Sequence, residues 1–112
     1  MIQRLVLLTA LALTATCGKS SDLLTAPSNA TVVVAKANYS FTPAWTAVPQ
    51  GSTVTFTFEG VAHAPTFSGV LGSPPNIPST ANASVQRTFG TKGQFNYTCS
   101  IHPFMTGRIT VQ

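Results

Sequence analysis

The feature that most constrains the fold is a series of short β-prone runs in which threonine alternates with larger apolar residues. The clearest is residues 53–58, where three threonines alternate with one valine and two phenylalanines. Such alternation is typical of a strand that buries one face. Turns rich in glycine or proline separate it from similar runs at residues 31–35, 66–68, 84–89, 94–99 and 107–112. Short strands at this spacing predict a small antiparallel β-sandwich, with an irregular loop at residues 69–83.

Composition supports an all-β class and excludes several others. The 112 residues include 17 threonines and 10 valines, which favour strands, while eight glycines and eight prolines work against long helices. Only 7% of the residues are charged, so neutral polar groups must cover most of the surface. A chain of this length forms one domain, which excludes a multidomain enzyme with a separate cofactor domain. A hydrophobic content of 44% with a net charge of only +4 excludes disorder.

Residues 1–16 have the pattern of an export signal. One early positive charge precedes a short apolar run, which is too short to span a bilayer, and small residues follow it. Cys17 stands where a bacterial lipoprotein signal places the cysteine that becomes acylated. We therefore expect an exported protein, periplasmic or lipid-anchored to a bacterial membrane through Cys17, with cleavage nearby and no lipid as the alternative. Residues 17–29 are predicted to form a flexible tether, and residues 30–112 the folded domain.

The processing of the N-terminus decides the state of the second cysteine. Two cysteines in an exported protein suggest a disulfide between Cys17 and Cys99. If Cys17 is acylated or removed, Cys99 is unpaired. It is then a buried inert thiol, a reactive thiol or a metal ligand.

The residues that could bind a soft metal are few and closely spaced. After residue 17 the chain holds one cysteine, two histidines and one methionine, and Cys99, His102 and Met105 fall within seven residues. Side chains three residues apart in a tight turn can converge on one point. His63 would join them from just beyond the strand predicted at residues 53–58. Each of these residues alone is more often structural, but chance rarely brings every soft donor of a chain into one pattern.

This set of donors selects the metal. One thiolate, two imidazoles and a weak thioether are the donors of a blue-copper electron-transfer site. Zinc seldom uses a thioether, and calcium or magnesium would need oxygen donors, whereas the chain has only two carboxylates, Asp22 and Glu59. The Cys-x-x-Cys-His motif of c-type haem is absent, and one cysteine is too few for an iron–sulfur cluster. One copper ion is therefore the expected cofactor.

The segment Cys-Ser-Ile-His-Pro-Phe-Met at residues 99–105 resembles the ligand loop of the cupredoxins, small type 1 blue copper proteins of the plastocyanin and amicyanin kind, and is closest to the amicyanin loop. The similarity covers about residues 30–112 and includes residues 41–43, 48–51, 53–56 and 93–97. It implies a Greek-key β-sandwich of about seven to eight strands with copper near one end. It also implies that His63, Cys99 and His102 are strong ligands, that Met105 is the weak axial ligand, and that electrons leave at His102 near the surface.

Two residues depart from the family pattern. Cupredoxins commonly have asparagine after the first histidine, whose side chain ties the two ligand loops together, and here that residue is Ala64. The tie is therefore missing or replaced. Amicyanin-like loops often carry proline where this chain has Ile101, whose backbone N–H could reach the Cys99 sulfur. Because hydrogen bonds to the sulfur stabilise the reduced metal, we expect Ile101 to raise the reduction potential relative to proline.

The expected function is to carry single electrons between redox protein partners, without enzymatic activity. We expect a monomer that binds no nucleic acid and contacts a membrane only through an N-terminal lipid. A net charge of about +3 after processing gives only mild steering toward acidic partners. An apolar docking patch is predicted around His102, with ordinary packing as the alternative, from Pro103, Phe104 and either Pro65, Phe67 or residues 69–78.

Two other functions are compatible with the same residues. An extracytoplasmic copper carrier or storage protein would use these donors to hand the ion over, although the chain has no extra methionine or histidine for transient binding. A thiol enzyme would use Cys99 as nucleophile and a histidine as base. It lacks a carboxylate near the pair, and Met105 would have no role in it.

Overall fold

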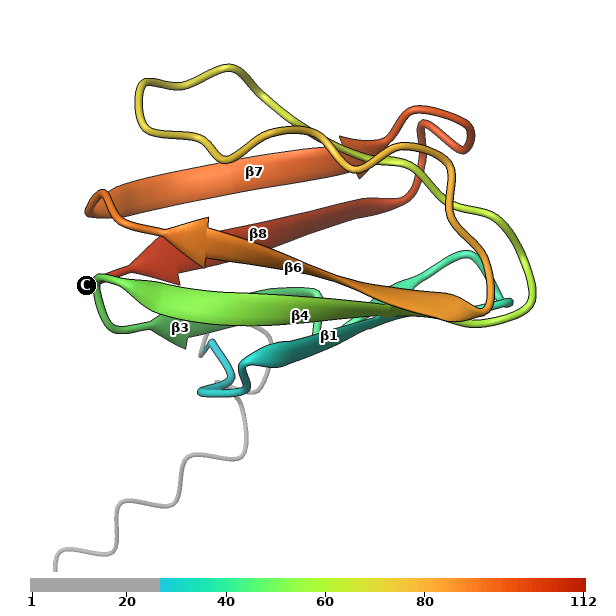
Figure 1. Ribbon diagram of the computed structural model, residues 1–112, viewed down its shortest axis with the longest axis horizontal. Helices are drawn as coiled ribbons and strands as arrows, with labels where there is room; N and C mark the ends of the chain where they lie inside the picture. Colours follow the sequence, from blue (N-terminus) through green and yellow to red (C-terminus); the bar gives the residue numbers. More distant parts are fainter. Residues whose placement is uncertain (1–26) are drawn as a thin grey trace, which may run out of the picture.

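The computed structural model describes residues 27–112, which form two four-stranded β-sheets packed face to face (Figure 1). One sheet has the strand order β2-β1-β4-β6 and the other the order β3-β8-β7-β5. In this part of the chain there is no helix with the length and hydropathy of a membrane span. The predicted all-β sandwich is confirmed, and its strands are β1 (Val32–Ala35), β2 (Phe41–Thr42), β3 (Trp45–Val48), β4 (Ser52–Phe58), β5 (Pro65–Phe67), β6 (Ala83–Phe89), β7 (Gly93–Cys99) and β8 (Thr106–Val111).

Both sheets are mixed, so the expectation of a purely antiparallel sandwich is wrong. β1 pairs with β4 in parallel, and β3 pairs with β8 in parallel, while the remaining pairs are antiparallel. A hairpin cannot join parallel neighbours, so the chain crosses from one sheet to the other between β2 and β3 and returns between β3 and β4. Threonine alternation gives the buried face of each strand, but it does not specify the partner strand.

The alternation in β4 determines which side chains enter the core. Val54, Phe56 and Phe58 are buried, while the threonines between them face outward. On the outer face, the hydroxyl of Thr53 pairs with that of Thr88 at 3.0 Å, and the hydroxyl of Thr57 with that of Ser84 at 3.1 Å. Hydrogen-bonded hydroxyls therefore cover the outer face of β4 and β6 without charged groups.

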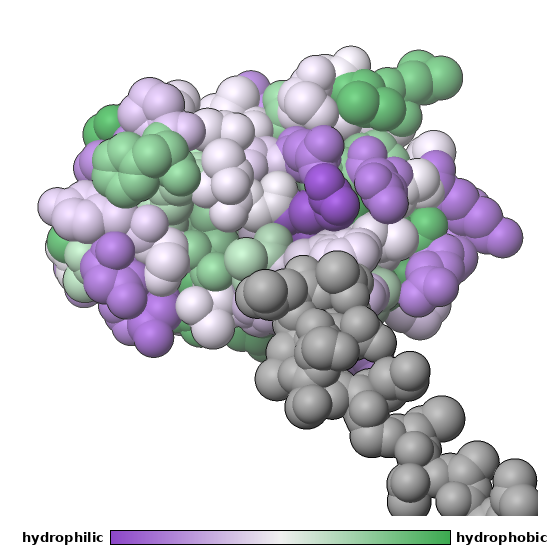
Figure 2. Space-filling model, turned by 180° about the vertical axis from the view of Figure 1, so that it is seen from behind, coloured by the Kyte–Doolittle hydropathy of each residue, from purple (hydrophilic) through white to green (hydrophobic). Residues whose placement is uncertain are grey.

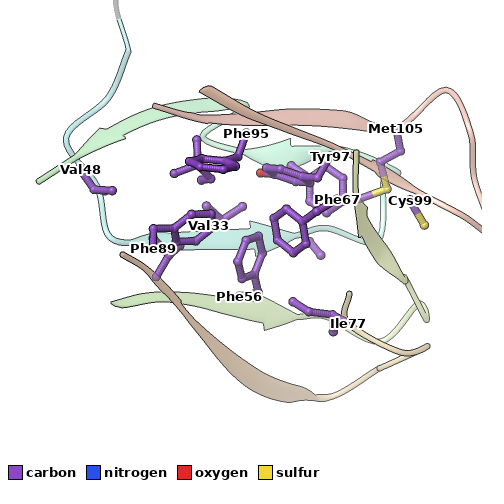
Figure 3. Close-up of a cluster of buried hydrophobic side chains, with 14 of the residues drawn as sticks. Val33, Val48, Phe56, Phe67, Ile77, Phe89, Phe95, Tyr97, Cys99 and Met105 are labelled. Carbon is purple, nitrogen blue, oxygen red and sulfur yellow. The ribbon is translucent and has the colours of Figure 1, made fainter. Parts of the chain in front are cut away.

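Aromatic rings fill the space between the sheets and lead toward one end of the sandwich (Figure 3). Tyr97 packs edge-to-face on Phe41 and Phe56, with ring centroids 4.8 and 5.6 Å apart. Such pairs stabilise a core by about 0.5–1.5 kcal/mol beyond the burial of their area. The Tyr97 ring lies so close to Gly107 that a Cβ there would lie 2.2 Å from its Cζ atom. Burial raises the pKa of the Tyr97 hydroxyl. The sulfur atoms of Cys99 and Met105 lie close together at one end of this core (Figure 3).

Residues 68–82 connect β5 to β6 and are called the β5–β6 loop below. The loop first runs to the end of the sandwich opposite Cys99, where a Cβ on Gly72 would lie 2.6 Å from Thr91 in the turn before β7. This part projects as a hydrophobic knob, at the upper left in Figure 1 and the upper right in Figure 2. The loop then turns back along β6, where the guanidinium of Arg87 donates hydrogen bonds to the carbonyls of Pro75 and Asn76.

Candidate metal centre

Residues 99–105, called the ligand loop below, form a compact turn after β7. The N–H of His102 donates to the carbonyl of Cys99 at 3.2 Å, and the N–H of Met105 donates to the carbonyl of His102 at 2.9 Å. The N–H of Cys99 closes the loop on the carbonyl of Met105 at 2.9 Å. Two successive three-residue turns thus place residues 99, 102 and 105 on the same side, as the sequence spacing predicts.

His63 approaches the ligand loop from the segment between β4 and β5. Its backbone exchanges two hydrogen bonds with Thr80, each 3.0 Å long, which anchors the segment to the end of the β5–β6 loop. The side chain is fully buried. Its Nε2 lies 2.9 Å from the carbonyl oxygen of Lys36, so that nitrogen carries the proton and donates it. Nδ1 is then left with its lone pair directed at the ligand loop.

The donor atoms of these residues converge. The Nδ1 atoms of His63 and His102 are 3.2 Å apart, and the Cys99 sulfur lies 3.9 Å from the first and 3.6 Å from the second. Cys99 is buried and, among residues 27–112, is a free cysteine. Met105 is also buried, with its sulfur beside that of Cys99 (Figure 3). The structure therefore brings together all four residues that the sequence singles out as metal donors. Cys17, the predicted site of the lipid, lies outside the described residues.

The hydrogen bond to the Cys99 sulfur comes from a residue that the sequence did not suggest for this role. The N–H of Ala64 donates to the sulfur at 3.3 Å, and within residues 27–112 Ile101 makes no such bond. The carbonyl of Ala64 accepts the N–H of Ser100 at 3.0 Å and the Ser100 hydroxyl at 3.5 Å. The backbone of Ala64 thus replaces the missing asparagine side chain as the tie between the two loops. The expectation that the N–H of Ile101 reaches the Cys99 sulfur is wrong, because the donor is the N–H of Ala64.

The surface around His102 is apolar, but its composition differs from the prediction in part. His102 is half-buried, Pro103 is exposed, and Phe104 has 72% of its surface exposed. Pro65 and Phe67 are buried in the sandwich and cannot contribute to a docking patch. The hydrophobic knob of the β5–β6 loop lies at the opposite end of the sandwich. Pro65 and Phe67 belong to the core because the alternation along β5 places both on its buried face.

One further contributor comes from the turn between β1 and β2, residues 36–40, which we call the β1–β2 turn. Its Tyr39 ring lies edge-to-face on His102, with centroids 4.7 Å apart, and 6.0 Å from the ring of Phe104. Its Lys36 supplies the carbonyl that binds His63. Neither residue was predicted from the sequence to lie at this site. Every residue type has a backbone carbonyl, so the sequence does not indicate the role of Lys36, and no sequence pattern around Tyr39 places it at the metal site.

Comparison with known proteins identifies the family. The model of a cupredoxin-like domain matches residues 6–111. The chain belongs to the cupredoxin-like family. Solved structures of cupredoxins share its fold: a proline-to-glycine variant of amicyanin in its reduced Cu(I) form at pH 4 is 30% identical over 79% of this chain and 87% of that chain, with a TM-score of 0.65. A purple cupredoxin from Nitrosopumilus maritimus is 26% identical over 72% of this chain and 98% of its own, with a TM-score of 0.63.

A copper enzyme also shares the fold over part of its length. A copper-containing nitrite reductase from Thermus scotoductus SA-01 is 29% identical, with a TM-score of 0.63, over 78% of this chain. This cupredoxin spans only 22% of that enzyme chain. A search among curated protein sequences finds no match.

The donors present fit a type 1 copper ion. The three strong donor atoms are one sulfur and two imidazole nitrogens, all within 4.8 Å of one another, and a thioether lies beside them. The deprotonated side of His63 faces the cluster, as binding to a metal requires. This cupredoxin site thus supports one copper ion, and no carboxylate oxygen competes for it, because Glu59, the one acid in residues 27–112, binds the N–H of Ala37 instead.

Proposed function

We propose that this protein is an exported type 1 copper protein that carries single electrons between redox protein partners and is not an enzyme. The observation that supports it most is the convergence of His63 Nδ1, Cys99 Sγ and His102 Nδ1 from two separate segments, with Met105 beside them. In this proposal the first three are the strong ligands and Met105 is the weak axial ligand. When bound, copper would supply one-electron chemistry between its +2 and +1 states.

The protein contributes rigidity to this chemistry. Cu(I) and Cu(II) prefer different geometries, so donors that are held firmly between the two preferences reorganise little when an electron moves. Here Cys99 ends a strand in the middle of a sheet, and three backbone hydrogen bonds close the ligand loop. Lys36 and Thr80 fix the side chain and the backbone of His63. The His63 ring and the backbone of the ligand loop are thus fixed by bonds that do not involve the metal.

Hydrogen bonding at the sulfur sets one part of the reduction potential. The N–H of Ala64 lies 3.3 Å from Cys99 Sγ. A donor at this position draws charge from the thiolate and favours the reduced metal. We therefore expect the backbone of Ala64, rather than Ile101, to raise the potential.

The exposed apolar surface around His102 is the proposed docking site for redox partners. Phe104 is 72% exposed, and Ile101 and Tyr39 are 46% and 44% exposed, around the half-buried His102. A hydrophobic cluster of this kind marks an interaction surface. The partial exposure of His102 makes it the point where an electron passes. Contact through neutral side chains suits short-lived complexes, and we expect a monomer that binds no nucleic acid.

The proposed location follows from the sequence before residue 27, which lies outside the described residues. Residues 1–16 would act as the export signal, and Cys17 would carry a lipid or be removed. Residues 17–29 would then form a tether to the copper domain, residues 30–112, although Ser28 near its end already pairs with β3. The domain would lie near a bacterial membrane or, without the lipid, free in the periplasm. Mass spectrometry of the protein from a membrane fraction would show a diacylated Cys17, whereas an unmodified N-terminus would contradict the lipid.

A copper titration tests the main proposal. Metal-free protein is mixed with one equivalent of Cu(II), and the visible spectrum should show an intense thiolate-to-copper band at roughly 600 nm. Repeated reduction and reoxidation should restore the band in full, with copper retained after gel filtration. Thr53→Ala, on the outer face far from the site, is the control variant that should behave like the wild type.

The same experiment separates electron transfer from copper carriage. A copper carrier or storage protein would bind the ion but lose it to a chelator during a few cycles, so the band would decline at each step. A protein without the band would contradict the electron-transfer proposal, and copper storage or a zinc site would then be the explanation to pursue.

A further inference from the structure

The β1–β2 turn contacts both histidines of the metal centre. The carbonyl of Lys36, at the start of the turn, accepts the Nε2 proton of His63. The ring of Tyr39, near its end, lies edge-to-face on His102 at 4.7 Å and on His63 at 6.2 Å. A single short turn therefore contacts both imidazoles.

The two histidines differ in how they are held. His63 is fully buried and has a backbone acceptor for its outer nitrogen. His102 is half-buried, and within residues 27–112 its ring nitrogens meet protein atoms only through Nδ1, at His63 and Cys99. The orientation of a histidine ligand is generally fixed by a contact outside the metal's coordination, most often a hydrogen bond from the other ring nitrogen. His102 has no such bond to the protein within residues 27–112, and its nearest aromatic contact is the Tyr39 ring, at 4.7 Å.

The backbone of Tyr39 does not account for the presence of tyrosine there. Its φ is +64°, in the left-handed region that asparagine and glycine adopt more readily than an aromatic residue. Strain of this kind persists only where the surroundings determine the conformation, and it often marks a functional position. Nor does burial explain the ring, since 44% of the residue surface is exposed. The ring lies at the edge of the exposed surface around His102, and its contacts there are with His102 and Phe104.

Glu59 holds the turn in place. Its carboxylate accepts the N–H of Ala37 at 2.6 Å, and its own N–H donates to the carbonyl of Ala35 at 3.1 Å. The turn is closed by hydrogen bonds from the N–H of Lys36 to the carbonyl of Ser40 and from the N–H of Tyr39 to the carbonyl of Lys36. Glu59 thus connects the end of β4 to a turn whose residues contact both histidines.

We propose that Tyr39 is a positioning residue of the copper centre, whose ring fixes the orientation of the His102 imidazole from a turn clamped by Glu59. The proposal rests on the copper site proposed above. It assigns to the β1–β2 turn the joint orientation of the two imidazoles, His63 through a carbonyl and His102 through a ring. Tyr39 itself does not bind the metal.

Substitution of Tyr39 by asparagine separates this role from a structural one. Asparagine tolerates the left-handed backbone, so Tyr39→Asn removes the ring while the turn is kept. We expect Cu(II) affinity, measured by chelator competition, to fall about tenfold, the scale on which residues that orient ligands act. The visible and EPR spectra should change, while the melting temperature of the metal-free protein stays close to that of the wild type. Tyr39→Phe keeps the ring and should restore affinity and spectra.

A measurement on the metal-free protein tests the contact without copper. The His102 ring proton resonances should shift in Tyr39→Asn, because the ring current of the tyrosine is lost, and should stay nearly unchanged in Tyr39→Phe. Unchanged resonances in Tyr39→Asn would overturn the proposed contact. Equal affinity and spectra of Tyr39→Asn and wild type would overturn the positioning role, as would an equal loss in Tyr39→Phe.

A double-mutant cycle tests the clamp. Glu59→Ala removes the acceptor for Ala37, whereas Glu59→Gln keeps an oxygen there and is the matched control. If both residues act through the same turn, the copper affinity of the Glu59→Ala/Tyr39→Asn double variant falls by less than the product of the two single losses. Independent effects that multiply would contradict the clamp. If the wild-type protein binds copper but cannot be reduced and reoxidised repeatedly, electron transfer is refuted but the role of Tyr39 is not. The copper affinities of the variants could still be compared in that case.

Discussion

The ligand loop and the β5–β6 loop are both irregular, yet side chains play different parts in holding them. Backbone hydrogen bonds among Cys99, His102 and Met105 close the ligand loop on itself. The β5–β6 loop is bonded through its backbone near its ends, for example between Thr80 and His63. Its middle depends on side chains as well, since Arg87 binds the carbonyls of Pro75 and Asn76, and the Asn76 side chain accepts the N–H of Phe67.

The difference shows what each arrangement leaves available. A loop that is closed by its backbone keeps its side chains free, and in the ligand loop these are the sulfur and nitrogen donors. In the middle of the β5–β6 loop, the carbonyls of Pro75 and Asn76 and the Asn76 side chain are engaged in holding the chain, and this part of the loop contributes shape rather than chemistry. The predictions below test this contrast, beginning with the largest expected effect.

Cys99→Ser should abolish the copper site while leaving the loop intact. A hydroxyl is a poor ligand for copper compared with a thiolate, so the band at roughly 600 nm should vanish and copper affinity should fall by at least about a hundredfold. The backbone bonds that close the ligand loop do not involve the side chain, so circular dichroism should show an unchanged β-sandwich. Loss of the folded spectrum would mean that the sulfur also supports the loop.

Met105→Gln should shift the reduction potential without loss of copper. An amide oxygen is a harder donor than a thioether and favours Cu(II), so the potential should fall by on the order of 100 mV, which corresponds to roughly a fiftyfold change in relative affinity for the two oxidation states. Cyclic voltammetry measures the shift, and Met105→Leu, which removes the donor, should move the potential upward. Equal potentials in all three proteins would exclude Met105 as a ligand.

Arg87→Met should loosen the β5–β6 loop and leave the metal centre unchanged. The half-buried guanidinium loses its bonds to Pro75 and Asn76, and unfolding by urea should show a loss of about 1 kcal/mol. Thr88→Ala on the same strand is the control for an ordinary surface change. The visible spectrum of the copper form should match the wild type, and an altered band would show that the two loops are coupled through Thr80.

Ile101→Pro should have the smallest effect. The N–H that proline removes does not reach the Cys99 sulfur, since the donor within residues 27–112 is Ala64. The reduction potential should therefore stay within about 20 mV of the wild type, less than half of the 59 mV that a tenfold change in relative affinity gives. A clear fall in potential would restore Ile101 as the sulfur's hydrogen-bond donor.

The same contrast explains how much could be predicted from the sequence. The spacing of Cys99, His102 and Met105 predicts their convergence because the ligand loop is local, and the alternation in residues 53–58 predicts the buried face of β4. The parallel pairing of β1 with β4 was not predictable, since it depends on which strands meet across the sandwich. The roles of Ala64 and Lys36 rest on backbone atoms, which every residue type carries.

Tyr39 and Arg87 were missed for a related reason. Their partners, His102 and the carbonyls of residues 75 and 76, are distant in sequence, and neither residue belongs to a motif. The docking patch was misassigned at Pro65 and Phe67 because the apolar character of a residue does not reveal whether it faces the core or the solvent.

The hydroxyl pairs on the outer face of β4 and β6 bear on how the protein responds to its surroundings. Thr53 with Thr88, and Thr57 with Ser84, cover the sheet with neutral groups whose hydrogen bonds do not depend on ionic strength. Mobile ions screen surface charges, and this face has almost none to screen. The contribution of this face to stability should therefore change little between dilute and concentrated salt.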